Sequence, residues 1–105
     1  MRCLILSLFL IAPLSLAQAQ SVEEGQTLFN DKCMSCHNPA ATGSVMLGKR
    51  LGEENAVLSE RNNLSAEYIK VVLRYGVGSM PWYRRSEISD AQADAIAAYL
   101  IRNNP

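Results

Sequence analysis

Apolar residues recur at helical spacing in three stretches of the chain, and nowhere do they show the strict alternation that is typical of a strand. The first stretch runs from about Val22 to Lys32 and begins with acidic residues, which suit the positive end of a helix dipole. The second opens at Ser65 and continues to Tyr75, where Gly76 is placed to end a helix. The pattern predicts an all-α domain.

The third predicted helix has the clearest start signal. Ser89 and Gln92 have the spacing of a capping box, in which each side chain bonds the backbone N–H of the other residue. Ile88 precedes the cap as a hydrophobic staple would, and apolar residues continue at helical spacing to Leu100. Residues 38–64, by contrast, are rich in glycine, asparagine and charge, and we expect mostly loop there, with room for one short helix. A loop of that length in a small domain needs something to wrap around.

The N-terminus has a different pattern. Arg2 makes the start positive, residues 4–16 form an apolar run, and Ala17-Gln18-Ala19 supplies the small-x-small sequence that signal peptidase cleaves. The run is shorter than the about 20 residues that a spanning helix needs. We therefore expect residues 1–19 to be a cleaved signal peptide and residues 20–105 to be one periplasmic domain without a membrane span.

Charge and cysteine content narrow the function further. Lys plus Arg and Asp plus Glu number 10 each, so the net charge gives no indication of nucleic acid or of an anionic membrane as partner. Cys3 lies in the expected signal peptide, which leaves Cys33 and Cys36 for the domain. A disulfide across two intervening residues would add little stability, because the stabilisation grows with loop length. A domain of this size buries only about 60% of its unfolded surface, and a large apolar cofactor would enlarge its core.

Cys33 and Cys36, followed directly by His37, form the C-x-x-C-H pattern of haem c attachment. Two thiols one helical turn apart can bond the two haem vinyl groups as thioethers, and the next histidine can coordinate the iron. A thioredoxin-like dithiol would need a βαβ context, a structural zinc site would need four ligands, and a plain disulfide is the remaining alternative. We predict one covalent haem c on the two cysteines, with His37, the only histidine, as an axial iron ligand.

The second axial ligand is expected from the loop after the second helix. Met80 follows a glycine-rich stretch that lets the backbone approach a cofactor closely, and Pro81 stiffens the chain behind it. A thioether opposite a histidine raises the reduction potential, and with both axial positions filled the iron is closed to small ligands. Met46 competes for this role because it also follows a Gly-Ser pair, but Met80 has the more suitable loop and lies farther along the chain from His37.

With these residues the chain resembles the class I, His/Met-ligated monohaem c-type cytochromes over essentially all of residues 20–105. Gly25 and Phe29 match the glycine–aromatic pair of the family's first helix, and Tyr99 matches the aromatic residue of its last helix. The resemblance implies a cytochrome c fold, with a few helices and long loops around one haem and with the terminal helices touching at the glycine. It also implies an electron carrier rather than an enzyme.

One position departs from that family. The proline whose carbonyl commonly accepts a hydrogen bond from the proximal histidine is missing, and Val45-Met46-Leu47-Gly48 stands in its place. A backbone carbonyl near Val45 or Met46 is a candidate acceptor for the His37 N–H, and the sequence does not determine which group accepts it.

The string from Arg74 to Trp82 is similar to the small cytochrome subunits of flavoprotein dehydrogenases of the p-cresol methylhydroxylase type. This similarity implies redox partner proteins: a dehydrogenase as electron donor, a flavoprotein among the candidates, and a downstream cytochrome or oxidase as acceptor. The alternative function is a haem enzyme or gas-binding sensor with an open axial site, which Met80 disfavours. A basic cluster near Met80 (Lys70, Arg74, Arg84 and Arg85) either docks an acidic partner or is simply solvated.

Overall fold

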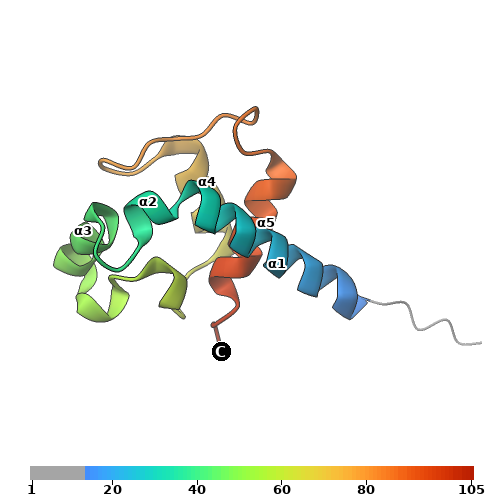
Figure 1. The fold of residues 1–105 in the computed structure, drawn as a ribbon, viewed down its shortest axis with the longest axis horizontal. Coiled ribbons are helices and arrows are strands. Elements are labelled where there is room, and N and C mark those ends of the chain that lie inside the picture. The colour runs from blue at the N-terminus through green and yellow to red at the C-terminus, as the bar shows by residue number, and fades with distance from the viewer. Residues whose placement is uncertain (1–13) are drawn as a thin grey trace, which may run out of the picture.

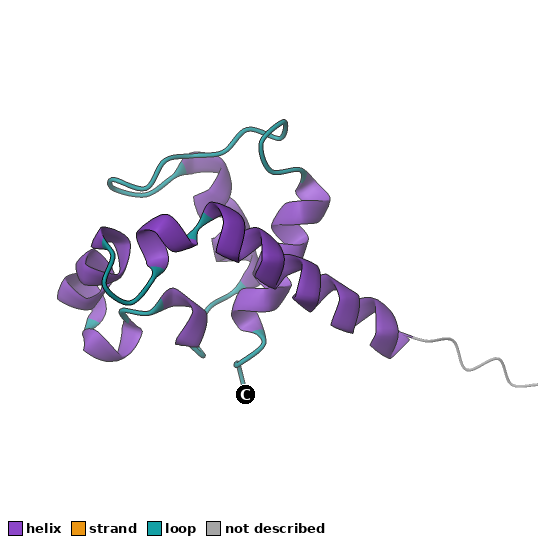
Figure 2. Ribbon diagram, in the orientation of Figure 1, coloured by secondary structure: helices purple, strands orange, loops and turns teal. Residues whose placement is uncertain are grey.

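The computed structural model describes residues 14–105, with side chains from residue 21 onward. The helices are α1 (Leu14–Lys32), α2 (Met34–His37), α3 (Thr42–Leu51), α4 (Ala66–Tyr75) and α5 (Asp90–Ile101), with the 3-10 turns η1 (Glu53–Asn55) and η2 (Leu58–Glu60). Figure 2 shows helices and loops and no strand in this part of the chain, where one isolated bridge pairs Val77 with Met80. The predicted all-α fold is confirmed.

The terminal helices α1 and α5 form the most extensively packed pair of elements. In Figure 1, α1 crosses α5 in the middle of the molecule and leads into α2 and α3 at the far end. Gly25 of α1 has no room for a side chain, because a Cβ there would overlap the carbonyl oxygen of Ala95 and lie 2.9 Å from Cβ of Tyr99. The expected contact of the terminal helices at Gly25 is confirmed.

The core lies between α1, α4 and α5. At its centre the rings of Phe29 and Tyr99 pack with their centroids 5.5 Å apart, at an angle of 47°. The buried cluster consists of Phe29, Cys33, Leu64, Ile69, Leu73, Ile88, Ala93, Ile96, Ala97, Tyr99 and Leu100. Because Cys33 belongs to this cluster, the core extends to the start of the C-x-x-C-H motif.

The predicted helix ends in the second half of the chain are confirmed. The Ser65 hydroxyl accepts a hydrogen bond of 3.1 Å from the Tyr68 N–H, and α4 ends at Gly76 with φ of 69°. At the start of α5, Ser89 and Gln92 form the capping box, with hydrogen bonds of 2.9 and 3.1 Å. These local signals set the length of the loop that joins the two helices.

Helix α1 begins at Leu14 and not near Val22 as predicted. The added residues are largely Leu, Ala and Gln, which are good helix formers and extend the helix without needing an apolar face. Residues 1–13 of the expected signal peptide lie outside the described residues, and residues 14–19 form the start of α1. Cleavage after Ala19 stays a prediction. None of the described helices is both long enough and apolar enough to span a membrane.

Residues 38–64 are more helical than the expected loop, since they contain α3, η1 and η2. Two glycines that lower the local helix propensity are the places where α3 touches its neighbours. Gly43 lies against α2, and a Cβ on Gly48 would be 3.2 Å from Cβ of Ala56. The helix ends at Gly52, whose φ is 93°. Tertiary contact therefore outweighs local propensity in this segment.

Asp90, at the first turn of α5, joins α4 and the preceding loop to α5. Its carboxylate accepts hydrogen bonds from Arg74 Nη2 at 2.8 Å and from Arg85 Nε at 3.1 Å. These bonds lower the pKa of Asp90 below its ordinary value of 3.8. The stability that such a lowered pKa provides is present above the ordinary pKa and is lost as the pH falls toward the pKa of the folded state.

We expect Asp90→Asn to lower the melting temperature at pH 7 and to lower it by less at pH 3, where the pH is below the ordinary pKa and part of the stabilisation is already lost. Thermal melts at the two pH values measure this difference. Asp94→Asn is the matched control, because Asp94 accepts from one partner only, Lys70, at 3.0 Å. A melting temperature of Asp90→Asn equal to that of the wild type at pH 7 would contradict the expectation.

Candidate haem-binding site

The C-x-x-C-H motif folds as a single helical turn at the end of α1. The His37 and Cys36 N–H groups donate to the Cys33 carbonyl over 2.9 and 3.1 Å. The Cys33 side chain is buried and that of Cys36 is exposed, and both thiols are free. Residues three apart on a helix share a face, so the two sulfurs lie on one side of the turn, as two thioether bonds to one macrocycle require.

The two thiols differ in environment. Burial raises the pKa of Cys33 to about 11, although the nearby Lys32 lowers it slightly. A buried thiol with a raised pKa is a weak nucleophile. Cys36 is therefore the more reactive of the two in the folded chain.

The His37 ring packs on the aromatic core. Its centroid lies 6.4 Å from that of Phe29, at an angle of 39°, so Phe29 stands between His37 and Tyr99 of α5. Burial lowers the pKa of His37 and favours the neutral imidazole, which is the form that coordinates a metal. The core thus holds the imidazole in a neutral, partly buried position.

The start of α3 packs against the same turn. A Cβ on Gly43 would overlap the Cys36 carbonyl oxygen and lie 3.4 Å from Cε1 of His37. Nδ1 of His37 is buried and makes no hydrogen bond with the described residues. The described residues therefore show no bond from His37 to a carbonyl near Val45 or Met46, the candidate acceptors, and these residues lie inside α3, where backbone carbonyls point along the helix axis.

The Met80 loop is a tight hairpin fastened to α4. Met80 N–H donates to the Val77 carbonyl at 2.9 Å and Val77 N–H donates back at 3.2 Å, while Gly78 at the tip has φ of 55°. The Tyr83 N–H donates to the Leu73 carbonyl at 2.8 Å, which ties the end of the loop to α4. Met80 is half-buried and packs against the core. The loop therefore presents Met80 inward from a fixed backbone.

Gly76, where the loop leaves α4, is required for two reasons. Its φ of 69° belongs to the left-handed region, and a Cβ there would lie 2.6 Å from the Met80 carbonyl oxygen and 3.2 Å from the Trp82 nitrogen. The position of the Met80 backbone thus depends on a glycine in the preceding turn.

Tyr83 connects the loop with the attachment turn. Burial raises the pKa of its phenol, and the negative charge that Cys33 and Cys36 would carry as thiolates raises it further. Tyr83 and Met80 both pack against the buried cluster that contains Cys33. The Met80 loop and the start of the attachment turn therefore share one part of the core.

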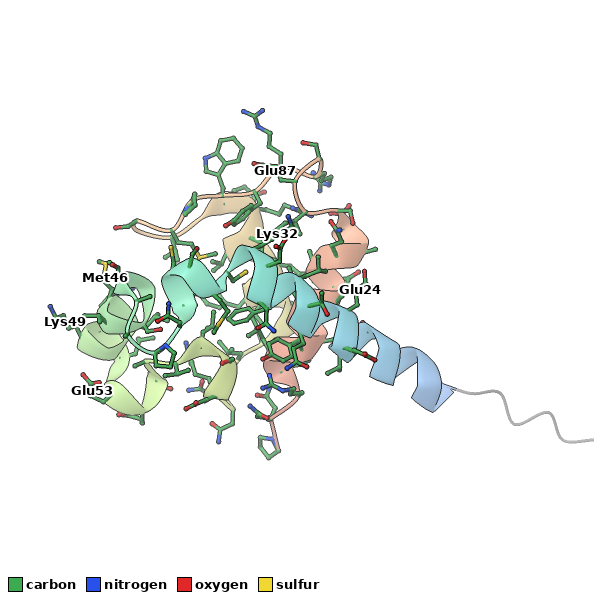
Figure 3. All side chains as sticks on the ribbon, viewed as in Figure 1. Glu24, Lys32, Met46, Lys49, Glu53 and Glu87 are labelled. Atoms are coloured by element: carbon green, nitrogen blue, oxygen red, sulfur yellow. The ribbon has the colours of Figure 1, made fainter. Side chains whose placement is uncertain are left out.

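Met46, the competing ligand, lies elsewhere. Figure 3 shows Met46 and Lys49 at the outer edge of α3, away from α1 and α5. The Met46 side chain is 43% exposed. The geometry favours Met80 over Met46 as the partner of His37.

The basic cluster is largely paired with acids of α5. Besides the two arginines bound to Asp90, Lys70 Nζ lies 3.0 Å from Asp94 Oδ1. The Arg84 guanidinium stands over the Trp82 ring at 5.6 Å from its centroid. Such pairing reduces the field that an acidic partner would meet, so the cluster serves mainly to join α4, the loop and α5.

The family is decided by comparison with known proteins. A model of the family described as "Cytochrome C oxidase, cbb3-type, subunit III" matches residues 20–100. The chain belongs to this family. It is also similar to the cbb3-type cytochrome c oxidase subunit CcoP of Azospirillum brasilense, with 27% identity over 85 residues that cover 78% of this chain and 28% of the relative. The chain thus spans little more than a quarter of that subunit. No solved structure matches it.

Membership of the cbb3-type subunit III family makes the chain a cytochrome c domain with covalently bound haem c, a cofactor of electron transport. The residues present fit this group. A pair of thiols on one turn, a neutral imidazole and an inward-facing thioether form the donor set that haem c takes from a protein. The predicted haem c is confirmed at the level of the family.

Proposed function

We propose that this cbb3-type subunit III family member is a periplasmic one-electron carrier that holds haem c through Cys33 and Cys36, with His37 and Met80 as the axial iron ligands. One observation supports the assignment: Met80 and Tyr83 both pack against the buried cluster to which Cys33 of the attachment turn belongs. A bound haem c supplies a couple of Fe(II) and Fe(III) that exchanges single electrons.

The side chains around the site have separate tasks. Phe29 orients the His37 ring from the core side, and the hairpin from Val77 to Met80 fixes the thioether. With haem bound, ligation by both His37 and Met80 would exclude oxygen and carbon monoxide from the iron, which favours a carrier over a haem enzyme or a gas sensor.

The partners follow from the chemistry and from the similarity. A carrier of this kind needs a donor, for which we propose a dehydrogenase, and an acceptor, for which we propose an oxidase or a further cytochrome. The similarity to a subunit of a cbb3-type oxidase supports the oxidase as acceptor. A flavoprotein dehydrogenase of the p-cresol methylhydroxylase type is the alternative context. An affinity pull-down from the native periplasm distinguishes them by the protein recovered.

We expect the protein, when produced with the haem c maturation machinery, to show a Soret band and a mass increase of one haem. Cys33→Ala and Cys36→Ala each remove one thioether bond, and the double variant is expected to lose covalent haem entirely. Denaturing gels stained for haem, together with intact mass, measure this loss. Cys3→Ala is the control, since it lies in the expected signal peptide and should leave haem content unchanged. A mature wild-type protein without a Soret band would refute the proposed function.

A further inference from the structure

Two buried side-chain atoms among the described residues have no hydrogen-bond partner, and they lie on neighbouring helices. One is Nδ1 of His37 on α2, and the other is Oγ of Ser44 on α3. Ser44 is 0% exposed. Buried polar groups are nearly always hydrogen-bonded, because an unpaired one has lost its water without replacement. Two such atoms on adjoining elements point to a common explanation.

The helix α3 approaches the His37 ring at the residue before Ser44. A Cβ on Gly43 would lie 3.4 Å from Cε1 of His37, and Cε1 is bonded directly to Nδ1. The glycine allows this approach, since a Cβ would also overlap the Cys36 carbonyl oxygen. The first turn of α3 therefore lies against the imidazole at Cε1, the atom between the two ring nitrogens.

The Ser44 hydroxyl is free to accept. A serine inside a helix often bonds a carbonyl of the preceding turn, but Ser44 Oγ makes no such bond. The neighbouring carbonyls are in use: that of Ala41 accepts from Val45 N–H at 3.0 Å, and that of Asn38 accepts from Ala41 N–H at 3.0 Å. An imidazole that coordinates through Nε2 carries its proton on Nδ1 and needs an acceptor there.

We propose that Ser44 Oγ accepts the hydrogen bond from His37 Nδ1–H in the haem-loaded protein, which makes Ser44 a positioning residue for the axial ligand. The bond would form directly or through one bridging water. This assignment rests on the proposed function, because it requires His37 to coordinate the iron. A hydrogen bond from Nδ1–H makes the imidazole a stronger donor to the metal, which favours Fe(III) and lowers the reduction potential.

The test compares Ser44→Ala with Thr42→Ala, which removes an exposed hydroxyl from the same turn of α3. We expect both variants to keep haem, and Ser44→Ala alone to raise the reduction potential. Loss of a hydrogen bond of ordinary strength changes the equilibrium constant for reduction by up to about tenfold, and a tenfold change is 59 mV for one electron. Ser44→Thr keeps the hydroxyl and should retain the wild-type potential.

The melting temperature of Ser44→Ala is a second measurement. It distinguishes a Ser44 that binds His37 from a Ser44 that has no partner. If Ser44 has no partner, Ser44→Ala removes an unpaired buried hydroxyl and leaves the melting temperature unchanged or higher. If Ser44 binds His37, Ser44→Ala leaves Nδ1–H unpaired and lowers it. An unchanged potential together with an unchanged or raised melting temperature would overturn the assignment.

If Ser44→Ala does not fold, the structure of the haem-loaded wild-type protein tests the assignment. A crystal structure of the haem-loaded chain should show Ser44 Oγ within hydrogen-bond distance of His37 Nδ1, or one water bonded to both. A different acceptor on Nδ1 overturns the role of Ser44 and leaves the proposed function intact. An iron ligand other than His37 in the same structure overturns the proposed function itself.

Discussion

Gly25→Ala is expected to destabilise the haem-loaded protein by about 3 kcal/mol, at the upper end of what overpacking a core costs. The added Cβ would overlap the Ala95 carbonyl oxygen, and it would lie 2.6 Å from the Ala95 carbonyl carbon. These are backbone atoms inside α5, so they cannot move aside as the end of a flexible side chain would. Equilibrium unfolding in denaturant, followed by helical circular dichroism, measures the loss.

Gly78→Ala is the matched control for that substitution. A Cβ on Gly78 meets nothing within 4 Å, so the only cost is the φ of 55°, which is about 1 kcal/mol for an alanine. Gly25→Ala should therefore be clearly less stable than Gly78→Ala. Equal stabilities would mean that α1 and α5 can move apart at little cost, and the close contact at Gly25 would not be what holds them.

Met80→Ala is expected to open one axial position while the haem stays covalently attached. The reduced variant should then bind carbon monoxide at neutral pH, and its reduction potential should fall, because a thioether ligand favours Fe(II). Absorption spectra with and without carbon monoxide, and a redox titration, measure the two effects. The backbone of the hairpin does not depend on the Met80 side chain, so the fold should persist.

Met46→Ala is the control for Met80→Ala, because Met46 is exposed at the outer edge of α3. It should leave the spectrum and the potential unchanged. An unchanged spectrum for Met80→Ala would remove Met80 from the coordination sphere. The alternative of a haem enzyme or gas sensor with an open site would then be favoured.

The elements that the sequence predicts well are those with local signals. The caps at Ser65 and Ser89 and the stop at Gly76 lie next to the turns that they define, so no distant contact is needed to recognise them. The sequence does not predict helix α3 at its full length, because its glycines lower the local helix propensity. Their reason is visible only in the folded chain, where Gly43 and Gly48 lie against α2 and Ala56.

In the candidate site, too, residues with a local sequence signal can be predicted, and residues placed by packing cannot. The attachment turn and Met80 are recognisable because each is a short string with a chemical purpose. Tyr83 and Ser44 are brought to the site only by packing: Tyr83 packs against the core that contains Cys33, and Ser44 is buried on α3, the helix that lies against the His37 ring. The candidate carbonyl near Val45 lies inside α3, a helix that the sequence does not predict at its full length.

The burial of Cys33 has a consequence for the attachment of haem. In the folded chain Cys33 is 9% exposed, and burial raises its pKa to about 11, so a reactive thiolate is scarce. We therefore expect thioether formation to be faster before the core has closed over Cys33. A chain that folds first is expected to resist later attachment, and a cell that delivers haem too slowly would accumulate a closed apoprotein.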